Sequence, residues 1–146
     1  MGKLDDPSRP AAQTKTILIV DDDESILNLL EILVQRDGFK VLTAESVKSA
    51  VYKLQRLPDL IILDLIMPGS SSGLEVLDHT GKDGLPPPKV VVITAANESH
   101  DAAKAARADA RVSHFLQKPI RQEQLLEILH RLLGTRLPKH GKQTDS

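Results

Sequence analysis

The sequence predicts one α/β domain built on an open, five-stranded parallel sheet with five helices on its two faces. Short apolar runs rich in valine, isoleucine and leucine alternate along the chain with longer segments whose apolar residues recur at helical spacing. This alternation repeats five times, too few for an eight-stranded barrel, so a doubly wound sheet is expected. Ligands of such sheets bind at the carboxyl ends of the strands, and the functional residues are expected there.

The five expected strands are apolar runs bounded by polar or turn-forming residues. The run at residues 60–63 is apolar throughout, which is typical of a central strand buried on both faces. The other four runs lie at residues 16–20, 39–43, 90–93 and 114–116.

The first two expected helices have clear end signals. Asp23 or Ser25 can cap the first helix, an apolar face follows at helical spacing, and Gly38 supplies its end. The second helix covers residues 47–54, and Pro58 stands just past it.

The other three helices differ in the strength of their pattern. Ser72 and Glu75 form a capping box at the start of the third helix. The alanine-rich residues 98–108 predict a fourth helix with a shallow apolar face. A strong apolar face at residues 125–133, followed by Gly134, predicts the fifth helix.

Composition excludes several classes of function. The chain has 146 residues and a formal net charge of −1, so no overall field would draw it to nucleic acid or a membrane surface. Aromatic residues make up 2%, which leaves no platform for stacking bases. There is no cysteine, and no apolar run approaches the ~20 residues of a membrane span. We therefore expect a cytoplasmic protein that binds neither nucleic acid nor membrane directly.

Both ends of the chain differ in composition from the middle. Residues 1–14 are polar and contain two prolines, and we expect a disordered segment. The folded domain is expected at residues 15–134, followed by a flexible tail or linker at residues 135–146. No output domain is expected after the fifth helix within this chain.

Chemically useful side chains stand at the ends of four of the five expected strands. Asp21 and Asp22 follow the first strand, Asp64 the third, Thr94 the fourth and Lys118 the fifth. Three neighbouring carboxylates repel one another, which raises at least one pKa unless a cation compensates. Oxygen ligands of this kind suit a hard divalent cation such as Mg²⁺.

The same residues fit the chemistry of phosphoryl transfer. Lys118 brings a compact ammonium group and Thr94 a hydroxyl donor, which together with a metal ion would surround a phosphoryl group. Asp64 would then be the nucleophile that forms an acyl phosphate.

Each of these residues alone also has a simpler explanation. The aspartates are common as helix caps and turn residues, Thr94 can be a strand-end turn residue, and Lys118 can be a surface lysine. Their joint placement at one edge of the sheet favours the phosphoryl-acceptor site.

Four segments carry a resemblance to a known family. They are residues 17–23 (ILIVDDD), 59–68 (DLIILDLIMP), 92–95 (VITA) and 116–119 (LQKP). In this order they resemble the four signatures of bacterial response-regulator receiver domains, over residues 16–133. The resemblance implies a flavodoxin-like (CheY-like) sheet with strand order 2-1-3-4-5.

The resemblance also implies a two-component signalling role. Asp64 would accept a phosphoryl group, in a Mg²⁺-dependent reaction, from a phosphohistidine on a sensor histidine kinase or phosphotransfer protein. Asp22 would ligate Mg²⁺ directly and Asp21 through water, with Asp64 and the backbone carbonyl of Ile66 completing the protein ligands. Lys118 would pair with the phosphoryl group, in a signalling domain that assists its own phosphorylation and is not an enzyme.

A conformational switch is implied as well. Thr94 would move to hydrogen-bond the phosphoryl group, and Phe115 would turn inward as it moves. The face formed by the fourth helix, fifth strand and fifth helix would then report to a partner or form a homodimer. The simpler explanation for Phe115 is core filling.

Three departures from the family pattern are relevant. Residues 69–73 form a longer loop than usual beside the acceptor. Arg121 stands where a capping residue is common at the fifth helix. Ile66 and Ala96 occupy the positions that tune loss of phosphate, and neither can hold an attacking water, so self-dephosphorylation is expected to be slow.

Three other functions would each require a different residue pattern. A degenerate receiver that acts as a phosphorylation-independent interaction module would have lost the acceptor, the acid pair or the lysine, and all are present. A phosphatase or hydrolase with an aspartyl nucleophile needs a second acid two residues on, where Ile66 stands. A nucleotide-binding domain needs a glycine-rich loop after the first strand, where the chain is acidic instead.

Overall fold

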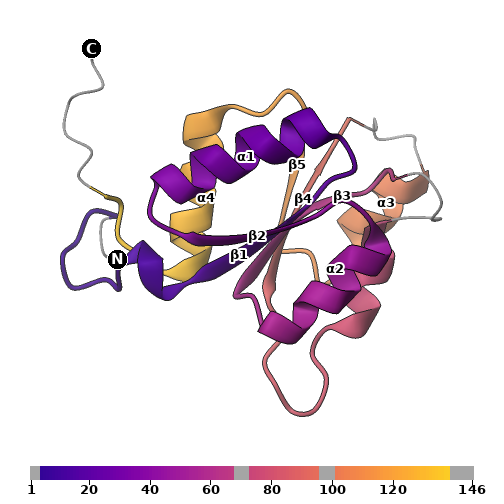
Figure 1. Ribbon diagram of the computed structural model, residues 1–146, viewed down its shortest axis with the longest axis horizontal. Coiled ribbons are helices and arrows are strands. Elements are labelled where there is room, and N and C mark those ends of the chain that lie inside the picture. Colours follow the sequence, from indigo (N-terminus) through magenta and orange to yellow (C-terminus); the bar gives the residue numbers. More distant parts are fainter. Residues whose placement is uncertain (1–3, 68–72, 96–100, 139–146) are drawn as a thin grey trace.

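A computed structural model describes residues 4–67, 73–95 and 101–138 (Figure 1). Its centre is a five-stranded parallel sheet with strand order β2-β1-β3-β4-β5. The strands are β1 (Thr16–Val20), β2 (Lys40–Ala44), β3 (Leu60–Asp64), β4 (Lys89–Thr94) and β5 (His114–Gln117). The predicted fold class and strand order are confirmed.

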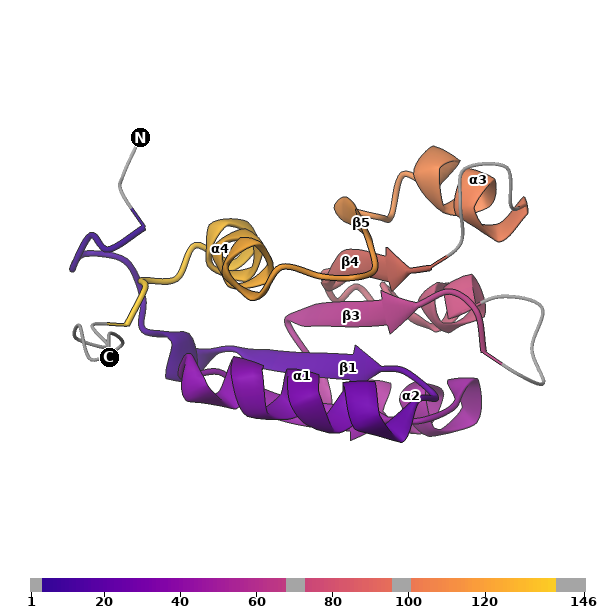
Figure 2. The same ribbon diagram turned by 90° about the horizontal axis from the view of Figure 1, so that it is seen from above.

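Helices cover both faces of the sheet (Figures 1 and 2). On one face lie α1 (Glu24–Arg36) and α4 (Gln122–Leu133), and on the other lie α2 (Val47–Lys53), the 3₁₀ helix η3 (Gly73–His79) and α3 (Asp101–Ala108). Two further 3₁₀ turns are η1 (Ala12–Thr14) and η2 (Leu54–Arg56). The third predicted helix is therefore η3, a 3₁₀ helix, and its expected cap at Ser72 lies outside the described residues, as do residues 98–100 of the fourth.

Alternating strand residues belong to two separate hydrophobic cores, one on each face of the sheet. Ile17, Ile19 and Ile62 pack under α1 and α4, whereas Leu18 and Leu63 pack under the helices of the opposite face. Every residue of β3 is buried, because this strand has neighbours on both sides and helices on both faces. This position explains its unbroken apolar sequence.

The ends of α1 and α4 follow the predicted signals. The Asp23 carboxylate caps α1 by accepting hydrogen bonds from the backbone N–H groups of Ser25 (2.9 Å) and Ile26 (3.3 Å). Gly134 ends α4 in the left-handed region at φ 67°. At the other end of α4, Arg121 makes no side-chain capping bond, as its sequence position predicts.

The segments before β1 and after α4 bind each other, and residues 4–14 with 134–138 are called here the terminal clasp. Backbone N–H groups of Arg136 and Leu137 donate to the carbonyls of Pro10 (2.8 Å) and Leu4 (2.7 Å). The Arg9 guanidinium donates to carbonyl oxygens at the end of α4. Composition predicts disorder for residues 1–14 and a flexible tail from 135, whereas the described parts of both make these specific contacts. The limits 15–134 of the folded domain stay a prediction.

A buried histidine ties the clasp to the helical layer beneath it. His130 is fully buried, and its ring nitrogens lie 2.8 Å from Thr135 Oγ1 and 2.6 Å from Asp37 Oδ2. These contacts connect the end of α4 to the end of α1. Within the described part of the chain, no helix combines the length and the apolar character needed to cross a bilayer.

Candidate functional site

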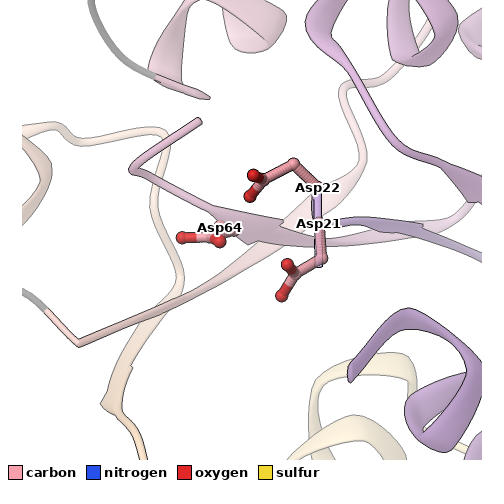
Figure 3. A group of neighbouring side chains, drawn as sticks. All are labelled: Asp21, Asp22 and Asp64. Carbon is pink, nitrogen blue, oxygen red and sulfur yellow. The ribbon is translucent and has the colours of Figure 1, made fainter. Parts of the chain in front are cut away.

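Three carboxyl groups meet at the carboxyl edge of the sheet. Asp21 and Asp22 follow β1, and Asp64 is the last residue of β3, the strand that pairs with β1. One oxygen from each carboxylate lies within 4.8 Å of the others. Figure 3 shows the three side chains gathered around the ends of these two strands. The juxtaposition expected from parallel strands is therefore present.

Local hydrogen bonds hold two of these carboxylates in place. Asp21 Oδ1 accepts from the backbone N–H of Asp23 at 2.9 Å, and Asp64 Oδ1 accepts from the backbone N–H of Ile66 at 3.1 Å. Asp21 and Asp64 are buried, whereas Asp22 is exposed. Two carboxylates of the site are therefore held in place by backbone hydrogen bonds, and the third faces solvent.

Lys118, the residue after β5, brings its ammonium group to the same point. Its Nζ lies 3.3 Å from Asp21 Oδ2 and 3.5 Å from Asp64 Oδ2. Its backbone N–H donates to the carbonyl of Thr94 at 3.0 Å, which joins the ends of β4 and β5. The lysine therefore bridges an acid of the pair and the predicted acceptor.

The electrostatics of the cluster favour a bound cation. Burial is the main cause that raises the pKa of Asp64 to about 6, and the charges of Asp21 and Asp22 add to it. The Ile66 N–H and the Lys118 ammonium act in the opposite direction. The Lys118 ammonium lies beside two of the three carboxylates, and this oxygen-only set fits a divalent ion such as Mg²⁺ with several waters.

Gly73 is a site residue that the sequence pattern did not single out. Its backbone N–H donates to the Leu65 carbonyl at 2.8 Å, and a Cβ at this position would lie 2.2 Å from the backbone oxygen of Asp64. No side chain fits between the start of η3 and the acceptor strand. The signal in the sequence was a glycine at the end of a serine run, which is also common in ordinary loops.

The two predicted switch residues lie near the site on neighbouring strands. Thr94 ends β4 and is fully buried, while Phe115 on β5 is half-buried and pairs with Val92. The guanidinium carbon of Arg107 in α3 lies 4.1 Å from the Phe115 ring centroid, a contact that no sequence pattern indicated. Ala96 and residues 68–72 lie outside the described residues.

Comparison with known proteins identifies the class to which this fold and site belong. The family model of the response regulator receiver domain matches residues 17–130. The chain therefore belongs to the response regulator receiver domains of two-component systems, a family whose members interact with histidine kinases and generally bind Mg²⁺.

Individual relatives agree with this assignment. The chain is 36% identical to the uncharacterised transcriptional regulatory protein YrkP of Bacillus subtilis over 75% of its length and 45% of that protein. It is 35% identical to the alkaline phosphatase synthesis transcriptional regulatory protein PhoP of the same organism, over 72% of this chain and 42% of the relative. The chain spans less than half the length of these two relatives.

Solved structures show the same fold. A receiver domain protein (CheY-like) from Methanospirillum hungatei JF-1 has a TM-score of 0.70 at 25% identity, covering 82% of this chain and 93% of that one. A receiver domain protein from Clostridium thermocellum has a TM-score of 0.68 at 26% identity, covering 82% and 94%.

Proposed function

We propose that Asp64 accepts a phosphoryl group from a phosphohistidine on a sensor histidine kinase or phosphotransfer protein. The observation that carries this proposal is the meeting of three carboxylates with the Lys118 ammonium at the carboxyl edge of a receiver-type sheet. Asp22 would hold Mg²⁺ directly and Asp21 through a water, with Asp64 and the Ile66 carbonyl as further ligands.

The transfer step needs little from the protein beyond charge and position. An Asp64 carboxylate oxygen forms a bond to phosphorus while the P–N bond of the donor breaks, and the imidazole nitrogen keeps the electron pair and takes a proton from solvent. Lys118 lies within reach of Asp64 and would neutralise a phosphoryl oxygen. Bound Mg²⁺ would supply further positive charge to the phosphoryl group.

The acceptor must be ionised to attack. The raised pKa of Asp64 works against this in the metal-free protein, while Lys118 favours the ionised form. With a pKa of about 6, Asp64 is already mostly a carboxylate at pH 7, and two positive charges beside it, the ammonium and a metal ion, would keep it ionised at lower pH as well. Phosphorylation is expected to require the divalent ion because a negatively charged phosphoryl group must approach three carboxylates, and the ion's charge would offset that repulsion.

The added charge of about −2 would then change the output face. Thr94 would turn toward the phosphoryl group and Phe115 would follow, which changes the surface of α3, β5 and α4. That surface would contact a partner or a second copy of the chain. The domain would act in the cytoplasm as a signalling element, without turnover of a substrate and without direct contact to DNA or membrane.

Intact-mass measurement with acetyl phosphate and Mg²⁺ tests the proposal. The protein should gain the mass of one phosphoryl group, and Asp64→Asn or removal of Mg²⁺ by a chelator should abolish the gain. Asp83→Asn is a matched control, because Asp83 is exposed on a loop at φ 58°, a conformation that asparagine tolerates.

Two outcomes would contradict the proposal. Equal phosphate gain by the Asp64→Asn variant would place the acceptor elsewhere. A wild-type protein that takes up no phosphate would instead support the phosphorylation-independent interaction module, although the presence of acceptor, acid pair and lysine does not favour it.

A further inference from the structure

Arg107 contacts the side chain on which the proposed signal depends. It lies in the last turn of α3, and its guanidinium carbon is 4.1 Å from the centroid of the Phe115 ring. Arg107 is exposed and Phe115 is half-buried, so the cation covers the ring at the edge of the core. A guanidinium at this distance from an aromatic face is attracted by the ring quadrupole.

The register of the sheet places this ring on the same side as Thr94. Phe115 pairs with Val92, and both pack in the core on the face covered by α2, η3 and α3. Thr94 follows Val92 by two residues in β4, so its side chain projects to that same face. Space that Thr94 vacates when it moves toward Asp64 therefore opens on the side of the sheet where the ring lies.

We propose that Arg107 is a positioning residue that holds the Phe115 ring in its outer, resting position and so sets how readily the domain switches. The inference deepens the proposed function and rests on it. A ring that turns inward leaves the guanidinium, so the contact stabilises only the resting state. Any contact present in one state alone shifts the equilibrium between the two states.

The composition of the chain provides a direct readout of the ring. There are only two phenylalanines, Phe39 and Phe115, so fluorine-labelled phenylalanine gives two NMR resonances. Phe39 is buried in the core under α1 and α4, on the face opposite Phe115, and serves as an internal reference. Beryllofluoride with Mg²⁺ is the probe, because it mimics a phosphoryl group on a carboxylate.

Arg107→Ala should shift the Phe115 resonance toward its beryllofluoride-bound position before any beryllofluoride is added. It should also increase beryllofluoride affinity by about two- to fivefold, the factor that corresponds to an exposed cation–π contact. Arg107→Lys, which keeps a cation, should lie between wild type and alanine. Lys104→Ala removes a charge from the same exposed side of α3 and should behave as wild type.

The outcomes separate this inference from the function on which it rests. Beryllofluoride binding that Asp64→Asn abolishes, with an unchanged affinity and Phe115 resonance in Arg107→Ala, would overturn the role of Arg107 alone. An equal affinity gain in Lys104→Ala would mean that the gain comes from the loss of a positive charge on α3, and not from loss of the contact with the ring. Absence of beryllofluoride binding by the wild-type protein would overturn the proposed function and this inference together.

Discussion

Asp64 combines two properties that conflict in the metal-free protein: it is 6% exposed and it lies beside two other carboxylates. Its raised pKa, about 6, means that the folded state binds a proton more tightly at this position than the unfolded chain does. This proton stabilises the folded state fully below pH 4, near the pKa of the Asp64 carboxyl in the unfolded chain, and the stabilisation is lost as pH rises through about 6.

Asp64→Asn should therefore be more stable than wild type at pH 7 in a chelating buffer. In the wild type, deprotonation of Asp64 between pH 4 and pH 6 should lower the free energy of unfolding by on the order of 3 kcal/mol. The asparagine is neutral at every pH, so the variant should not show this loss. Urea unfolding of both proteins across this range measures the difference, which Mg²⁺ should reduce. Parallel pH profiles for the two proteins would show that Asp64 titrates normally.

A phosphoryl group on Asp64 should be lost slowly. The Ile66 side chain is 44% exposed beside the acceptor, yet it has no polar atom that could orient an attacking water. We expect loss of phosphate on the order of hours in Mg²⁺ without a partner. Intact mass after removal of the donor measures it, and Ile66→Asn should shorten the lifetime. A wild-type half-life of seconds would contradict the argument.

At the scale of elements, burial decided which patterns could be interpreted from the sequence. The central strand β3 is apolar up to its last residue, Asp64, and the predicted runs fall within a residue of the observed strands; β2, for example, begins at Lys40 where Phe39 was predicted. A capping box at Ser72 and Glu75 predicted the third helix, but its 3₁₀ form was not predicted. Its start is set by the close approach of Gly73 to the Asp64 carbonyl, a contact between two elements.

Gly73→Ala tests that close approach. A methyl group 2.2 Å from the Asp64 oxygen must push η3 or the end of β3 aside, which should cost about 1–3 kcal/mol of stability and slow phosphorylation. Gly84→Ala is the control, because its Cβ meets nothing within 4 Å and only its positive φ of 74° adds strain. Chemical denaturation and phosphorylation rates of both variants are compared. Equal loss of stability in the two variants would mean that the close contact costs no more than the positive φ of Gly84 does.

At the scale of the whole molecule, the site could be predicted because topology alone brings it together. Parallel strands place Asp21, Asp64, Thr94 and Lys118 at one edge whatever the helices do. The terminal clasp and the Arg107–Phe115 contact could not be predicted in this way. They depend on which backbone carbonyl or ring happens to lie within reach of a particular arginine in the finished fold.

Loss of a clasp arginine should weaken the fold without affecting the site. Arg136 donates from Nη1 to the Pro7 carbonyl at 2.9 Å, and the clasp lies at the amino ends of the strands, the edge opposite Asp64 (Figure 2). Arg136→Ala should cost about 1–2 kcal/mol of stability and leave the phosphorylation rate unchanged. Arg56→Ala, an exposed arginine on η2, is the control. A slower phosphorylation in Arg136→Ala would show that the two edges are coupled.

The clasp also has a topological consequence. Because the backbone of Leu137 is hydrogen-bonded to that of Leu4, the described polypeptide is nearly a closed ring. A short covalent link between the two ends would cross no core and displace no strand. The chain could then be opened at the exposed turn around Gly84 while every strand keeps its neighbours. The site would therefore form even if the strands followed one another along the chain in a different order.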